Sequence, residues 1–412
     1  MNKTSLPIQI VAGILAAFIL GILYITQEWD PTYILFYTKP LGISFINSLK
    51  IIAVPMIFTS IVASINNTKT TNELHLIALK TCAIYISTTL IATFLGLSLA
   101  NLIQFRKICK KFDFTHTPHI PNPTSALPTS TDAFIPVNLF KAISDNQNLL
   151  FIVCFALLFG ITSQKLTKEK REIISTFFAA INDTFIHITN FIMHFAPIGA
   201  FALTLSVLIE QTNNKLSNIS SLLKVVACYA ATVLFSLAIM VFIIYPLFIL
   251  FFSKVSPRKF LQAIQPAQLV ALSTSSSSAT LPVTIDCTKR LGVSEEICNL
   301  VLPIGATINM NGTVINQAIS VIFVTQLYGI DLSISNQLFI AAYIAILSLG
   351  IAALPGTSLG ITSLLFLKLN LPPEAISPIL LVDRLLDMFR SATNVSGDIC
   401  AAIIANQLKS ER

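Results

Sequence analysis

The sequence predicts an all-α membrane protein, and three observations lead to this fold class. Of its 412 residues, 54% are hydrophobic and only 11% are charged, whereas about 25% of residues are charged in an average soluble protein. The mean hydropathy is +0.78. Apolar runs of roughly 20 residues, the length that a helix needs to cross a bilayer, recur along the chain. We therefore expect a polytopic protein in a lipid membrane.

The net charge of +7 does not indicate a nucleic-acid partner, because the 26 Lys and Arg lie mostly between apolar runs. Positive residues concentrate there on the cytoplasmic side of membrane proteins. Seven cysteines form no CxxC pair, so neither a zinc site nor a disulfide framework is expected.

The first apolar run, from Ile8 to about Ile25, is expected to be a spanning helix. A cleaved signal peptide is the alternative, but this run is longer than the ~7–15 apolar residues of such a peptide. Seven further spans are expected near residues 44–65, 79–103, 149–164, 177–209, 222–252, 293–325 and 376–406. Several are longer than a perpendicular helix needs, and Pro55, Pro197 and Pro303 are places for kinks.

Two apolar segments do not fit simple spans. Residues 261–285 contain a Ser/Thr run that ends at Pro282, and residues 337–368 are interrupted at 353–358 by Pro355 and Gly356. Non-helical backbone at membrane depth needs protein or a water-filled cavity to satisfy its polar groups. We expect two re-entrant helical hairpins, each followed by a span with the pattern Asn-x-x-Gly, which is a weak internal repeat. Paired interrupted segments of this kind indicate the central site of a transporter.

The last span carries Asp387, Arg390, Asn394 and Asp398 at spacings of three, four and four residues. At about 100° per residue these side chains share one face of the helix. A charge at membrane depth costs about 2.5–3.5 kcal/mol, so it persists where it meets an ion, a substrate or another charge. A transport path is therefore expected here, and a purely structural Asp–Arg pair is the alternative.

Three segments carry the resemblance to a known family: Ala271–Pro282 (ALSTSSSSATLP), Leu302–Thr313 (LPIGATINMNGT) and Asp387–Asp398 (DMFRSATNVSGD). They resemble the sodium-coupled glutamate/aspartate (dicarboxylate/amino acid:cation) symporter family, and the resemblance extends along the chain in span order. It implies eight transmembrane helices plus two re-entrant hairpins, built as inverted repeats, in a homotrimer in the bacterial inner membrane.

The resemblance also implies two domains that move against each other like an elevator. Spans 1, 2, 4 and 5 would form a scaffold domain within residues 1–252, and spans 3 and 6 in the same part would belong to the transport domain. Residues 253–412, with hairpin 1, span 7, hairpin 2 and span 8, would form the transport core.

Carried over by position, the substrate site implied by the resemblance falls on Ser275, Ser277, Thr313, Leu354, Ser358, Asp387, Arg390, Ser391 and Asn394. Arg390 offers a fork of N–H donors that suits a carboxylate, and Asp387 can accept from an ammonium group. This combination favours an acidic amino acid. A C4-dicarboxylate such as succinate or malate is the second choice, because it has no ammonium group for Asp387.

Sodium is the coupling ion that the resemblance implies. The first site would use Gly305, Asn309, Asn394 and Asp398, and a second Thr307, Ser348, Leu349 and Ile351. A third would use Tyr85, Thr88, Thr89, Asn309 and Asn311, but the family has Asp where this chain has Asn311. The third site should therefore be weaker or absent. Gln317 also replaces a Glu of proton-coupled relatives, and the extra arginine that relatives carry at the position of Ser275 or Met388 is missing.

A passive anion channel is a remaining alternative, which accumulation of substrate against a gradient would exclude. An enzyme is not expected. An intramembrane hydrolase would need a base beside its nucleophile, and no His lies in the first hairpin or the last two spans.

Overall fold

The structure is a computed structural model that describes residues 6–27, 29–66, 72–105, 149–212, 216–349, 357–371 and 373–410. Within these ranges the chain is helical apart from short connections. Four single helices are long and apolar enough to cross a membrane, over Ile8–Thr26, Pro31–Ala63, Leu79–Ile103 and Leu222–Phe252. A bent pair, Lys168–Met193 with Ala196–Ser206, would be a fifth if the two helices cross as one span. The count of eight spans and the re-entrant placement of two hairpins stay predictions.

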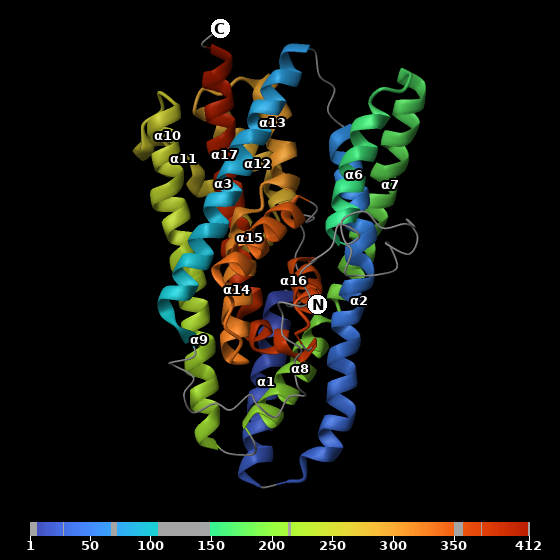
Figure 1. The fold of residues 1–412 in the computed structure, drawn as a ribbon, viewed down its shortest axis with the longest axis vertical. Helices are drawn as coiled ribbons and strands as arrows, with labels where there is room; N and C mark the ends of the chain where they lie inside the picture. The colour runs from blue at the N-terminus through green and yellow to red at the C-terminus, as the bar shows by residue number, and fades with distance from the viewer. Residues whose placement is uncertain are drawn as a thin grey trace, which may run out of the picture.

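One group of helices comes from the first half of the chain. It consists of α1 (Leu6–Thr26), α2 (Pro31–Asn66), α6 (Leu149–Ser163), α7 (Lys168–Met193) and α8 (Ala196–Thr212). Helix α2 packs against α6, α7 and α8, and α1 packs against α8. In Figure 1, α2, α6 and α7 stand together on the right, and α1 and α8 lie at the lower centre.

Helix α2 is longer than the sequence predicted, because it begins at Pro31 rather than near residue 44. The polar residues of its first turns, Thr32 and Lys39 among them, hid its start from a search for apolar runs. The N–H of Thr32 donates to Oδ1 of Asp30 at 3.0 Å, which holds the pKa of that carboxyl below its usual value. Asp30 followed by Pro31 is thus a normal helix start, with a side-chain cap and a proline that needs no N–H partner.

The predicted span 177–209 is not one straight helix. The chain bends by 53° between α7 and α8, just before Pro197. Proline cannot donate to the preceding turn, so it fits the first turn of a new helix. Pro55, by contrast, lies inside α2 without interrupting it.

The second group contains α3 (Asn72–Ile103), α9 (Leu216–Ile239), the π-helical turn η4 (Met240–Ile244), α10 (Tyr245–Phe252) and all later elements. These later elements are α11 (Pro257–Thr274), α12 (Ser277–Arg290), α13 (Glu295–Ile308), α14 (Asn311–Leu327), α15 (Ile334–Ser348), α16 (Thr357–Lys368), the 3-10 helix η5 (Pro373–Ile376) and α17 (Ser377–Ser410). Helix α17 packs against α9, α11, α12, α13 and α14. It is therefore the element around which the site can form.

The predicted span 293–325 is divided in two. The break is not at Pro303, which lies inside α13, but at Asn309 (φ −90°, ψ 80°) and Met310 (φ −104°, ψ 43°). Neither residue has helical dihedral angles. The break leaves backbone groups without helical partners, next to α17.

The two interrupted segments differ in packing. Helices α11 and α12 meet at Ser275, whose φ of 54° and ψ of 32° are left-handed, and the two helices pack against each other. Helix α15 packs against α3, α6 and α14, whereas α16 packs against α2, α14 and η5. The tip between α15 and α16, including Leu354, lies outside the described residues.

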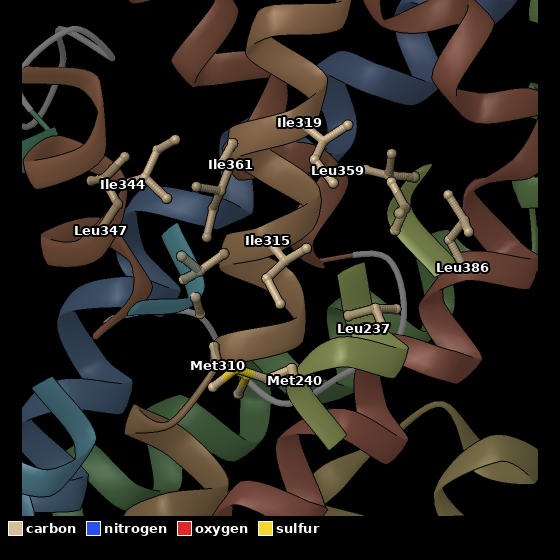
Figure 2. Close-up of a cluster of buried hydrophobic side chains, with 14 of the residues drawn as sticks. Leu237, Met240, Met310, Ile315, Ile319, Ile344, Leu347, Leu359, Ile361 and Leu386 are labelled. Atoms are coloured by element: carbon tan, nitrogen blue, oxygen red, sulfur yellow. The ribbon is translucent and has the colours of Figure 1, made fainter. Parts of the chain in front are cut away.

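The core lies around α14, which is buried on every face over almost its whole length. Figure 2 shows Ile315 and Ile319 of α14 in a cluster with Leu237 of α9, Ile344 of α15, Leu359 and Ile361 of α16 and Leu386 of α17. Because so many elements share this cluster, the polar residues at the start of α14 are held at the centre of the protein.

Candidate functional site

The polar stripe of α17 is buried as a unit, since Asp387, Arg390, Asn394 and Asp398 are each less than 8% exposed. The structure brings Arg390 and Asp387 together, with Nη2 donating to Oδ1 of Asp387 at 2.9 Å. The same nitrogen lies 2.9 Å from Oδ1 of Asp383, with which it forms an ion pair. Arg390, only 1% exposed, thus lies between two buried carboxylates.

Arg390 keeps unused donors. Its Nε and Nη1 are buried and have no hydrogen-bond partner among the described residues. Buried polar groups are nearly always paired, so unpaired N–H groups of a guanidinium indicate a missing anionic partner. The planar fork of a guanidinium suits a carboxylate with two parallel bonds.

Two serines of the expected substrate site also have unpaired hydroxyls. Oγ of Ser275, at the left-handed end of α11, and Oγ of Ser358, in the first turn of α16, are buried without partners among the described residues. The other expected contacts Ser277, Thr313 and Ser391 are buried as well, at the starts of α12 and α14 and in α17. Leu354 lies outside the described residues.

Asn394 ties α17 to the break between α13 and α14. Its Oδ1 accepts from the N–H of Gly312 at 2.7 Å, and its Nδ2 donates to Sδ of Met310 at 3.2 Å. The two backbones are in contact here, because a Cβ added at Gly312 would lie 2.6 Å from the carbonyl oxygen of Arg390.

Helix α11 is also joined to α17, since Nε2 of Gln268 donates to Oγ of Ser396 at 2.9 Å.

The first expected cation site is brought together by the structure. Nδ2 of Asn309 donates to Oδ1 of Asp398 at 2.8 Å and to the carbonyl of Asn394 at 3.4 Å. A Cβ at Gly305 would lie 2.6 Å from Oδ1 of Asp398, so this backbone passes directly beside the carboxylate. The carbonyl of Gly305 accepts the N–H of Asn309 at 2.8 Å and keeps a second lone pair.

These residues fit a monovalent cation. Asp398 is fully buried, and within the part of the chain that the structure describes no Lys or Arg forms an ion pair with it. Oδ1 of Asn309 is likewise buried without a partner there. A buried carboxylate without a counter-charge is unfavourable, and freed carbonyls of broken helices are the usual sodium ligands in transporters.

Most residues of the expected third cation site are hydrogen-bonded, to one another or to neighbouring residues. Oγ1 of Thr89 donates to Oδ1 of Asn311 at 2.9 Å, and Nδ2 of Asn311 donates to the hydroxyl of Tyr245 at 3.0 Å. The hydroxyl of Tyr85 donates to the carbonyl of Val301 at 3.1 Å, and Thr88 bonds back to the carbonyl of Tyr85. The amide of Asn311 thus has both of its ends occupied.

The second expected cation site is only partly described. Thr307 lies in the last turn of α13, and Ser348 and Leu349 lie at the end of α15, while Ile351 is outside the described residues. Gln317, on α14, is fully buried, and neither of its amide atoms has a partner in the described part of the chain.

Three residues that contact the expected site residues were not identified from the sequence, namely Asp383, Arg384 and Tyr245. Asp383 lies four residues before Asp387, so the helical period alone could have placed it on the same face. Arg384 is also within one turn of Asp387, and its Nη1 lies 3.5 Å from Oδ2 of that residue. Tyr245 gave no local signal, because only the folded chain brings α10 to Asn311.

The profile of the sodium:dicarboxylate symporter family matches residues 6–408. The proton/sodium-glutamate symport protein of Bacillus subtilis is 28% identical over 98% of this chain and 93% of its own length. The proton/glutamate-aspartate symporter of Escherichia coli is 28% identical over 98% of this chain and 92% of its own length. Excitatory amino acid transporter 3 of the mouse is 30% identical over 98% of this chain and 85% of its own length.

Proposed function

The chain belongs to the sodium:dicarboxylate symporter family, and we propose that it imports an acidic amino acid, glutamate or aspartate, together with Na⁺. It is an integral membrane transporter and not an enzyme. Relatives that align with 98% of this chain are named for glutamate, for glutamate and aspartate, and for excitatory amino acids. We place this chain in the bacterial inner membrane.

One observation carries the choice of substrate. Arg390 is fully buried, lies between Asp383 and Asp387, and has two unpaired donor nitrogens. A substrate carboxylate would satisfy these donors, and the ammonium group would be accepted by Asp387. A neutral amino acid would leave Nε and Nη1 of the guanidinium without an acceptor in a buried site, which is unfavourable.

The hydroxyls of Ser275 and Ser358 support the same proposal, because they are buried donors that have no other partner in the described residues. They would hold the other carboxylate of the substrate, together with the first N–H groups of α12, a helix of 14 residues. Helix N-termini favour anions.

Sodium coupling is proposed through Asp398, Asn309 and the carbonyls of Gly305 and Asn394. The cation would neutralise Asp398, and Asn394 would join the ion to the substrate, since its side chain already holds Gly312 at the start of α14. Coupling would then be mutual stabilisation of one state by two ligands. The second site, at Thr307, Ser348, Leu349 and Ile351, is proposed to bind a further Na⁺.

We propose two coupled sodium ions rather than three, or a third that binds weakly. The amide of Asn311 removes the charge that a carboxylate would supply, and Oδ1, the atom that could face the ion, already accepts from Thr89 while Nδ2 donates to Tyr245. Some relatives are named for protons as well as sodium, and Gln317 has no proton to carry in place of a glutamate.

We further propose an elevator mechanism in a homotrimer. The group of α1, α2, α6, α7 and α8 would be the scaffold, and the group around α17 would move against it. This assignment is supported by the extensive packing within each group, while the contact between the groups is largest where α16 meets α2 and α17 meets α8.

The test is uptake by the purified protein in proteoliposomes. Labelled aspartate, glutamate, succinate and serine are compared with and without an inward Na⁺ gradient. We expect accumulation of aspartate or glutamate against its gradient only when Na⁺ is present. Uptake independent of sodium, serine as the best substrate, or flux that never exceeds equilibrium would contradict the proposal, the last by indicating a channel.

A further inference from the structure

Arg384 is a second cationic side chain at the acidic pair of α17. Its side chain is only 12% exposed, and Nη1 lies 3.5 Å from Oδ2 of Asp387. Its Nε is buried and has no partner within the described residues. Arg384 is thus held at the site by its charge partner and is not a solvated surface arginine.

The surroundings of Arg384 are otherwise apolar. Together with Asp383 and Asp387 it borders a cavity whose other walls are Ile10, Phe45, Met193, Ala196, Ala200, Leu359 and Leu380. Apolar walls weaken the screening of charges, so interactions among these ionic groups are stronger than at a wet surface.

The charges of the cluster balance only when Arg384 is counted. Asp383 and Asp387 carry two negative charges and Arg390 carries one positive charge, which leaves one carboxylate uncompensated. Each oxygen of Asp387 faces its own guanidinium, Oδ1 facing Arg390 and Oδ2 facing Arg384. With Arg384 the four groups are neutral before any substrate enters.

We propose that Arg384 is a specificity-determining residue that admits C4-dicarboxylates without an amino group, such as succinate, beside acidic amino acids. The inference rests on the proposed function, because it takes Asp387 and Arg390 as the substrate site. Without Arg384, a ligand that lacks an ammonium group would leave Asp387 buried with Arg390 as its cationic partner, and Asp383 shares that arginine. With Arg384, Asp387 stays paired while Arg390 turns its free donors to the ligand.

Arg384 also competes with the substrate ammonium for Oδ2 of Asp387. The amino group of aspartate therefore contributes less to the binding free energy than it would beside an unpaired carboxylate. We expect the affinity of the wild-type protein for aspartate to exceed that for succinate by less than about tenfold, which corresponds to a difference in binding free energy of about 1.4 kcal/mol.

The experiment measures Na⁺-driven uptake of labelled aspartate and labelled succinate in proteoliposomes. It compares the wild type with Arg384→Met, which removes the charge, and with Arg384→Lys, which keeps it. The matched control is Arg290→Met, at a side chain that is 70% exposed and paired with Asp286. The readout is the ratio of the KM for succinate to the KM for aspartate.

The ratio is expected to rise at least tenfold in Arg384→Met and to stay near the wild-type value in Arg384→Lys and in Arg290→Met. An unchanged ratio in Arg384→Met would overturn the proposal, because a merely structural arginine would affect both substrates alike. Absence of succinate uptake by the wild type would also overturn it, while leaving the proposed transport of aspartate intact.

A second variant covers failure of Arg384→Met to fold. Arg384→Met combined with Asp387→Asn removes both members of the pair, so no buried charge is left alone. This double variant is expected to take up succinate and to lose aspartate preference. Retained preference for aspartate in the double variant would overturn the role of Arg384. If the wild type takes up succinate but not aspartate, the proposed function fails. The inference about Arg384 is then tested by the KM for succinate alone, which is expected to rise at least tenfold in Arg384→Met.

Discussion

At the scale of single residues, the burial of Arg390 determines how its surroundings respond to substitution. Its guanidinium forms ion pairs with Asp383 and Asp387 inside the protein, where water cannot replace it. Removing one member of a buried ionic group costs about 3–5 kcal/mol, because the remaining charges lose their partner. The same residue would serve both stability and binding.

Substitution Arg390→Ala is therefore expected to reduce aspartate uptake at least about 100-fold, which corresponds to the lower end of that cost. Arg390→Lys should remain strongly impaired, because a single ammonium group cannot replace the guanidinium fork. Initial uptake rates, normalised to folded protein by size-exclusion chromatography, measure the effect. Arg290→Ala is the control, and activity near wild type in Arg390→Ala would exclude Arg390 from the site.

A second residue-scale prediction concerns Asn311. Asn311→Asp restores a carboxylate beside Thr89 and Tyr245, so a further Na⁺ should bind and the Hill coefficient for Na⁺-dependent uptake should rise by about one. Asn316→Asp is the matched control, because it adds a carboxylate to the same buried helix but beside Tyr229. A Hill coefficient near three in the wild type, unchanged by Asn311→Asp, is the result that refutes two-ion coupling.

At the scale of elements, the contact of α14 with α17 depends on the absence of a side chain at Gly312. A Cβ there would lie 2.6 Å from the carbonyl oxygen and 2.8 Å from Cα of Arg390, and both are backbone atoms that cannot move aside. Overpacking of this kind costs about 1–3 kcal/mol. The helices would have to separate next to Asn394.

Gly312→Ala is expected to lower the Tm by about 1–3 °C and uptake by at least tenfold. Gly21→Ala serves as the control, since its nearest atom is a methyl group of Leu208 at 3.1 Å, the end of a flexible side chain. Thermal denaturation in detergent and uptake are measured on the same preparations. Equal stability of the two variants would show that α14 and α17 are not closely packed in the membrane.

The elements also show what the sequence could and could not predict. The Ser/Thr run before Pro282 located the turn between α11 and α12, and the period of α17 placed four polar residues on one buried face. The start of α2 and the break at Asn309 were missed. A hydropathy pattern does not detect a helix start made of polar residues. The break at Asn309 depends on contacts with α17, such as the hydrogen bond from Asn309 to the carbonyl of Asn394, which lies 85 residues away in the sequence.

At the scale of the whole molecule, α16 forms the most extensive contact between the two groups of helices. It packs against α2 of the first group and against α14 of the second. A Cβ at Gly360 would lie 3.6 Å from Cβ of Leu49, which is within the range for a disulfide. Cysteines at positions 49 and 360 can therefore be used to test whether the two groups of helices move against each other.

In a background without the seven native cysteines, Leu49→Cys with Gly360→Cys is expected to form a disulfide under oxidation. If α16 slides along α2 during each cycle, oxidation should abolish uptake and reduction should restore it. Either single cysteine variant is the control. Full uptake by the crosslinked protein would mean that α2 and α16 do not move against each other, and the elevator assignment would be wrong at this contact.

The π-helical turn at Met240–Ile244 has a consequence for how this protein can change in evolution. Tyr245 follows it directly, and its hydroxyl accepts from Asn311 at 3.0 Å and donates to the carbonyl of Thr393 at 3.3 Å. A π turn holds one residue more than an α-helical turn over nearly the same rise. Loss of one residue within the turn would therefore leave α10 and Tyr245 close to their present orientation, whereas loss of one residue from α9, with the turn kept, would rotate Tyr245 by about 100° away from both partners. Descendants of this chain can therefore lose one residue at this turn, but not in α9, without altering the site.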